Sequence, residues 1–101
     1  MIVYNVTLSI LPEIENEVVA WLKNEHIPEV MDTNLFLEYK MFRIVENPIT
    51  KTHNSFAIQY VLESWENFET YNTKHAPLLR AKTIEKYGER VLAFRTFLEK
   101  I

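Results

Sequence analysis

Two short stretches of this sequence carry the side chains best suited to acid–base chemistry. His26 and His75 each stand two residues before a proline, in "KNEHIPEVM" and "TKHAPLLRA". Imidazole is the side chain whose ordinary pKa lies nearest neutral pH, so either histidine could act as a general acid or base, or as an axial haem ligand. The alternative is structural, because each follows a run with helical spacing. There the proline ends the helix and the histidine donates to the freed carbonyl groups.

A second pair of residues could bind an anion. Arg43 and Arg95 recur in the similar stretches "MFRI" and "AFRT", and a guanidinium group matches the geometry of a carboxylate or a phosphate. Asn5 and Gln59 would add neutral hydrogen bonds to such a ligand. The competing interpretation pairs both arginines with carboxylates of the protein itself, since buried charges need partners.

Two aromatic residues could form the wall of a ligand cleft. Trp21 and Tyr71 each lie in a run of apolar residues with helical spacing. A flat ligand could stack against them, but aromatic residues in this pattern are more often part of the core.

Several other functions find no support in the sequence. The three histidines show no recognised metal-ligand spacing, there is no cysteine, and the single glycine, Gly88, cannot form a phosphate-binding loop. We therefore expect neither metal nor cofactor. A net charge of −3 and a pI near 5.6 argue against nucleic-acid binding. No apolar run approaches the roughly 20 residues that span a membrane, and no signal peptide is visible, so we expect a cytoplasmic protein.

The elements that must position these residues follow from periodicity and from the prolines. Alternation predicts strands at residues 2–11, 36–46, 53–62 and 90–98. Helices are predicted from Pro12 to residues 25–27, and from a cap at Ser64 through an interruption at Pro77 to Gly88, with a turn-rich connection at residues 47–52. The order β-α-β-β-α-β predicts an α+β, ferredoxin-like single domain over residues 1–101. It would have a four-stranded antiparallel sheet with both helices on one face.

Alternation within the strands predicts which side of the sheet the helices cover. The wholly apolar side is expected there, and it comprises Tyr4, Val6, Leu8, Ile10, Phe42, Ile44, Phe56, Ile58, Tyr60, Leu62, Leu92, Phe94 and Leu98. The opposite side would carry Arg43 and Arg95 among amides and apolar side chains. Because such a mixed surface is too apolar to remain in water, we expect a second copy of the chain to cover it.

The stretches "YNVTL", "WLKNEHIP", "FAIQY", "HAPLLRA" and "FRTFLE" resemble a small bacterial family known as a domain of unknown function. The layout resembles the dimeric α/β-barrel superfamily, in which two ferredoxin-like subunits press their sheets together. That superfamily includes cofactor-free monooxygenases, haem-degrading proteins and isomerases, so fold alone does not choose a function.

Two functions therefore remain open. The first is a homodimeric interaction or binding module for a small anionic or aromatic ligand. The second is a small cofactor-independent monooxygenase or isomerase with His26 or His75 as its acid–base group. An enzyme should show a cleft of roughly 300 Å³ or more with a histidine at its wall. A pure assembly module should instead show both histidines bonded to carbonyl groups.

Overall fold

The computed structural model of the chain describes residues 1–45 and 54–101. The strands are β1 (Ile2–Ile10), β2 (Tyr39–Ile44), β3 (Asn54–Leu62) and β4 (Val91–Glu99). The helices are α1 (Glu15–Trp21), the π-helical segment Leu22–His26, α2 (Ile27–Met31), α3 (Trp65–Lys74) and α4 (Ala76–Tyr87). Short 3-10 turns at Pro12–Ile14 and Gly88–Arg90 precede α1 and β4. The connection predicted at residues 47–52, with Glu46 and His53 beside it, lies outside the described residues.

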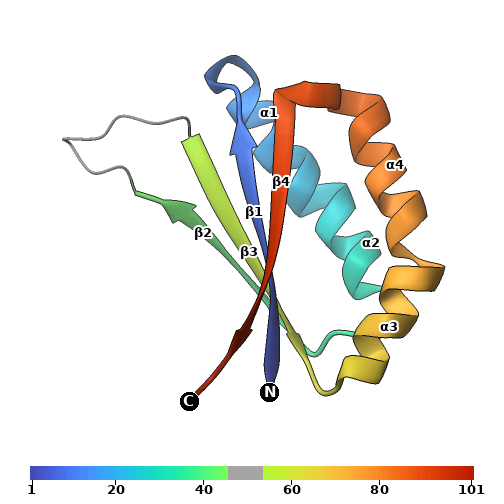
Figure 1. Cartoon of the computed structure of the whole chain (residues 1–101). Helices are drawn as coiled ribbons and strands as arrows, with labels where there is room; N and C mark the ends of the chain where they lie inside the picture. Colours follow the sequence, from blue (N-terminus) through green and yellow to red (C-terminus); the bar gives the residue numbers. More distant parts are fainter. Residues whose placement is uncertain (46–53) are drawn as a thin grey trace.

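The four strands form one antiparallel sheet in the order β2-β3-β1-β4. Figure 1 shows the helices gathered on one side of this sheet. The ferredoxin-like α+β fold predicted from the sequence is thus confirmed. The two central strands, β1 and β3, bury their helix-facing side chains as predicted, and Tyr4, Leu8, Phe56, Ile58 and Tyr60 are each 5% exposed or less.

The two edge strands face the opposite way from the prediction. On β4, Val6 of β1 lies beside Arg95 and Leu8 lies beside Ala93, so Arg95 faces the helices and Phe94 faces away from them. On β2, Arg43 lies beside Phe56 of β3, which also places it on the helix side. The prediction was wrong because it assigned the more apolar side of each edge strand to the helices. Strand pairing decides the matter instead, since residues paired in register share a face.

This reversal makes the outer face of the sheet more apolar than predicted. Its edges carry Phe42, Ile44, Leu92, Phe94 and Leu98, all between 43% and 63% exposed. Between these edges runs a polar strip from the two central strands, which comprises Asn5, Thr7, Ser9, Ser55 and Gln59. The outer face therefore remains a candidate interaction surface, but it does not contain the two arginines.

The first helical segment continues beyond the predicted end at residues 25–27. In the π-helical segment the backbone N–H of Ile27 donates to the carbonyl of Leu22, one residue further back than in an α-helix. Pro28 then occupies the first turn of α2, where its missing N–H would have had no partner in any case. The helix passes the proline and ends at Met31. The widened turn is therefore what allows the chain to include the proline without breaking.

The second helical segment follows the prediction more closely. The Ser64 hydroxyl accepts a hydrogen bond of 3.2 Å from the backbone N–H of Asn67 and so caps α3. His75 lies at the junction between α3 and α4, with Pro77 in the first turn of α4. Gly88 ends α4 with a φ of +57°, a conformation that glycine adopts without a steric penalty.

Candidate functional site

A cleft of about 430 Å³ lies between the helices and the sheet. Strands β1 and β4 contribute its floor, and the α1–α2 segment and α4 contribute residues to its walls. Val6 and Ala93 on the floor are only half-buried, although Val6 lies in the middle of a central strand. The volume lies within the range of roughly 300–1,000 Å³ that is typical of small-molecule sites. It also exceeds the roughly 300 Å³ that we expect of an enzyme cleft.

His26 lies at the wall of this cleft, at the end of the π-helical segment. Its ring stacks on the indole of Trp21, with centroids 5.0 Å apart and an interplanar angle of 25°. Among the described residues, no side chain or carbonyl group forms a hydrogen bond with its imidazole. Burial lowers the pKa of His26 below its usual value of 6.5, and the charges of Arg95 and Lys82 lower it further, while Glu29 raises it. The ring is therefore mainly neutral at neutral pH and can accept a proton.

Two guanidinium groups reach the cleft from opposite elements. Arg95 lies on the floor beside Val6, and Arg80 comes from α4. Arg80 Nη2 lies 3.4 Å from the hydroxyl of Tyr4 and 3.4 Å from Oδ1 of Asn72. Within residues 1–45 and 54–101, neither arginine forms an ion pair with a carboxylate. The cleft therefore holds two guanidinium groups that form no ion pair within the described part of the chain.

Three tyrosines pack around one end of the cleft. Tyr4 lies with its ring centroid 6.1 Å from those of both Tyr60 and Tyr71. Burial and the neighbouring Tyr4 raise the pKa of Tyr71 to about 12, although Arg80 and Arg95 act in the opposite direction. Burial also raises the pKa of Tyr60. These hydroxyl groups therefore stay protonated at neutral pH, where they can donate hydrogen bonds to a ligand.

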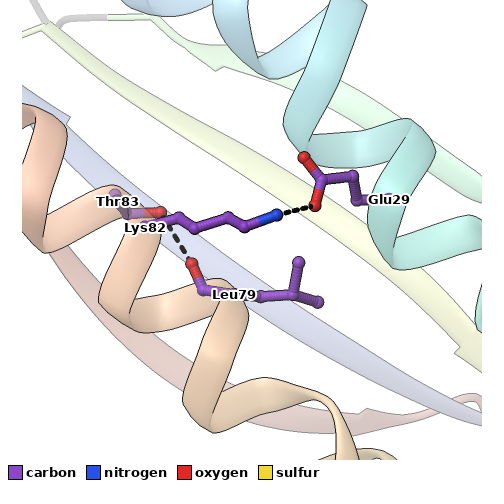
Figure 2. Close-up of polar contacts among 4 residues, drawn as sticks. All are labelled: Glu29, Leu79, Lys82 and Thr83. Atoms are coloured by element: carbon purple, nitrogen blue, oxygen red, sulfur yellow. Dashed lines mark hydrogen bonds and ion pairs between the residues drawn. The ribbon is translucent and has the colours of Figure 1, made fainter.

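An ion pair joins the two helical walls next to His26. Figure 2 shows Lys82 of α4 reaching across to Glu29 of α2, with 2.7 Å between Nζ and Oε2. On the same turn of α4, the hydroxyl of Thr83 donates to the carbonyl of Leu79 at 3.3 Å, which satisfies that hydroxyl within its own helix. Leu79 and Thr83 both line the cleft. The bridge therefore ties together the elements that carry the site.

The structure brings four of the predicted site residues together at the cleft, namely His26, Trp21, Tyr71 and Arg95. The two-histidine arrangement is absent from the cleft, because His75 is not among its lining residues. His75 lies between α3 and α4, and its ring centroid is 6.5 Å from that of Tyr71. No described residue forms a hydrogen bond with the imidazole of His75, so neither histidine caps a carbonyl group as the structural interpretation required.

Three other predicted site residues lie elsewhere. Arg43 makes an ion pair of 3.0 Å with Glu15 and stacks over the ring of Phe56, 4.8 Å from its centroid. Asn5 and Gln59 are paired with one another across β1 and β3, on the outer face of the sheet. They therefore cannot share a binding site with Arg95, which lies on the helix side.

Sequence reasoning did not identify Arg80 as a site residue. A signal was present, because Ala76, Leu79, Arg80 and Thr83 follow the spacing of one helix face. Ala76 and Leu79 are buried on that face, and Arg80 is half-buried beside them. An arginine in register with two apolar core positions therefore indicated a charge directed into the cleft.

Solved structures with this fold come from proteins with different described activities. A member of the ethyl tert-butyl ether d (ethd) family from Bacillus halodurans has a TM-score of 0.72, at 18% identity over 100% of both chains. SnoaB, a cofactor-independent oxygenase from Streptomyces nogalater, has a TM-score of 0.64, at 11% identity over 99% of this chain and 92% of its own. A dimeric ferredoxin-like protein from an uncultured marine organism has a TM-score of 0.59, at 11% identity over 99% of this chain and 97% of its own. At these identities the likeness concerns the fold alone.

At the level of sequence, no curated protein matches the chain. None of the helices in the described part of the chain is long and apolar enough to cross a bilayer. One family does match, and the match extends over residues 1–101. The chain therefore belongs to the family described as domain of unknown function DUF4286.

Proposed function

We propose that this protein binds a small anionic or aromatic molecule in the cleft between its helices and its sheet. The observation that carries the proposal is the cleft itself, which has a volume of about 430 Å³ over a floor left half-open at Val6 and Ala93. Protein interiors are normally packed without voids of this size, so a space lined by aromatic side chains and arginines is a candidate for a ligand.

Binding of 2-naphthol, a neutral aromatic probe, tests whether the cleft accepts ligands at all. We expect a dissociation constant on the order of 0.1 mM by calorimetry, because a ligand of this size gains about 0.5 kcal/mol for each non-hydrogen atom. An Ala93→Phe variant should fill the floor and abolish binding. The matched control is Ala81→Phe, since Ala81 is exposed on α4 and does not line the cleft. Equal binding by both folded variants would contradict the proposal.

A second candidate function is cofactor-independent catalysis with His26 as a general base. It is favoured by an imidazole that lies at the cleft wall, has a lowered pKa and has no hydrogen-bond partner among the described residues. A base of this kind removes a proton most effectively when its pKa is close to the working pH. The fold is also shared by SnoaB, which is described as a cofactor-independent oxygenase.

Ring opening of 5-nitrobenzisoxazole tests this second candidate, because any positioned base in an apolar pocket accelerates it. His26 would remove the proton from C3 while the N–O bond breaks, and the released phenolate is coloured. We expect a rate above that of free imidazole, lost in His26→Gln and kept in His75→Gln. If the two variants behave alike, His26 is not a positioned base.

We further propose that the protein is a homodimer joined through the outer face of the sheet. The exposed apolar edges on β2 and β4 support this proposal. A second copy placed on this face would cover these edges.

A further inference from the structure

The charge balance of the cleft indicates the type of molecule that it holds. Arg80 and Arg95 enter the same cavity from α4 and from β4, and neither pairs with a carboxylate in the described part of the chain. Among the described residues, Arg80 makes two long hydrogen bonds, both to neutral groups, namely the Tyr4 hydroxyl and the Asn72 amide. A guanidinium beside apolar walls is most stable when an anion completes its hydrogen bonds, so the cavity favours a negatively charged occupant.

Arg43 lies at the position on β2 that corresponds to Arg95 on β4, and its surroundings differ from those of Arg95. It stands in "MFRI" as Arg95 stands in "AFRT", and both face the helix side of the sheet. Glu15 neutralises Arg43 at a distance of 3.0 Å. Within the described residues, no carboxylate does the same for Arg95. The two arginines occupy equivalent strand positions, so the strand pattern alone does not leave Arg95 unpaired. The residues around the cleft do.

The two arginines line the same cavity as Tyr71 and His26. Their charges act on the hydroxyl of Tyr71, since each opposes the rise in its pKa. Arg95 also acts on His26. An anion inside this cavity would therefore be attracted by both guanidinium groups.

The remainder of the lining suits a flat and conjugated ligand body. Tyr4, Tyr60 and Tyr71 form a cluster of rings, and the Trp21–His26 stack presents two further rings. Rings favour other rings in stacked or edge-to-face arrangements. The acidic side chain of Glu89 also lines the cavity, which disfavours a ligand with several negative charges.

We propose that the cleft binds a planar aromatic monocarboxylate, with its carboxylate between Arg80 and Arg95 and its ring among the tyrosines and the Trp21–His26 stack. This inference rests on the proposed ligand-binding function and narrows it to one class of molecule. The carboxylate is favoured over a phosphate monoester because the dianion would face Glu89.

The test compares 2-naphthoate with 2-naphthamide, which has nearly the same shape and no charge. We expect the acid to bind at least about tenfold more tightly, with an advantage that falls as salt is added. Decalin-2-carboxylate, which keeps the charge but not the flat ring, should bind about tenfold more weakly than 2-naphthoate. 2-Naphthyl phosphate should also bind more weakly, and tighter binding by the phosphate would overturn the carboxylate assignment.

Two variants decide whether the arginines cause this preference. Arg95→Met should remove the advantage of the acid over the amide while leaving binding of the amide unchanged, and Arg80→Met should reduce that advantage. Arg43→Met is the matched control and should keep the full advantage. Thermal unfolding of each variant shows that it is folded, and Arg95→Met should fold normally because Arg95 is exposed to the cleft and bonds to no described residue.

The outcomes separate this inference from the function on which it rests. If neither the acid nor the amide binds wild-type protein, the proposed function itself fails. If both bind with equal affinity, the cleft is a ligand site but not an anion site, and only the present inference fails. If Arg43→Met loses the preference as fully as Arg95→Met does, the effect reflects the net charge of the protein and the inference is again overturned.

Discussion

The two halves of the molecule carry the same short pattern and put it to different uses. In each half a histidine is followed by a buried small or branched residue, a proline, a more exposed residue and a second buried residue. The matched positions are His26 and His75, Ile27 and Ala76, Pro28 and Pro77, Glu29 and Leu78, and Val30 and Leu79. In the first half the helix continues through the pattern by widening one turn, whereas in the second half the chain starts a new helix.

The difference shows that a cleft can draw unequally on two similar halves of a chain. It takes its histidine from the first half, and it takes Arg80 and Arg95 from the second. The corresponding His75 lies outside the cleft, and the corresponding Arg43 is neutralised by Glu15. Surroundings therefore decide the role of each residue, although the local sequence is nearly the same.

The largest expected effect is on the free energy of unfolding. It comes from replacing a buried residue of the first half with its counterpart from the second half. Ile27 is 1% exposed, and its counterpart is Ala76. Ile27→Ala should lower the free energy of unfolding by about 2–5 kcal/mol, because it removes buried methyl groups and leaves a cavity. Urea denaturation measures this loss. Leu78→Ala is the control, since Leu78 is 66% exposed and its truncation should change the free energy by less than about 0.5 kcal/mol. Equal effects would mean that the buried side chain of Ile27 contributes no more to stability than the exposed side chain of Leu78.

Substitutions on the outer face of the sheet should weaken dimerisation equally in the two halves, whereas the cleft residues of the two halves differ. Phe42 and Phe94 are matched positions on β2 and β4, and they are 48% and 63% exposed. Replacing either with glutamate should weaken the proposed dimer by at least about tenfold, or about 1.4 kcal/mol, because an unpaired carboxylate would enter an apolar interface. Analytical ultracentrifugation measures the change, with Leu78→Glu on α4 as the control. A wild-type protein that is monomeric at high concentration would rule out the interface.

His26 should make the stability of the protein depend on pH. The pKa of folded His26 lies below the unfolded value of 6.5, so the unfolded chain binds more protons in the interval between these two pKa values. Stability should therefore fall as the pH falls through that interval, with a slope of no more than about 1.4 kcal/mol per pH unit. Denaturation at a series of pH values should show the slope in wild type and in His75→Gln, but not in His26→Gln. A slope that survives in His26→Gln would assign it to other groups.

The smallest expected effect concerns the ion pair that joins the two halves. A double-mutant cycle with Glu29→Gln and Lys82→Met should give a coupling of about 0.2–1 kcal/mol, because both side chains are more than a third exposed and water screens their attraction. The coupling should shrink at high salt. The Glu15–Arg43 pair, which lies within the first half, serves for comparison. If the Glu29–Lys82 coupling were zero at low salt, the bridge would not hold the walls together.

The sequence predicts the fold better than it predicts the site. Alternation on β1 and β3 identifies their buried face, because helices cover these central strands and only one side of each is apolar. Ser64 and Gly88 mark the ends of helices through local hydrogen bonding and backbone geometry, which depend on near neighbours. On the edge strand β4 both sides are apolar, so pattern alone could not orient Arg95 and strand pairing had to decide.

The widened helical turn was also beyond sequence reasoning. A proline normally ends or bends a helix. Whether the chain instead forms a π-helical turn depends on whether the apolar side chains after the proline can be buried. Here the burial of Leu22, Ile27 and Val30 holds the segment against the sheet on both sides of the widened turn. That widening places His26 against Trp21, so the site depends on a choice made by tertiary packing.

The π-helical turn has a consequence for reading related chains. A π-helical turn holds about one residue more than an α-helical turn. A relative that lacks one residue between Trp21 and Pro28 can therefore close this turn to an α-helical one and keep α2 packed against the sheet. Such a gap would mark a chain that keeps the architecture but no longer stacks this histidine on Trp21.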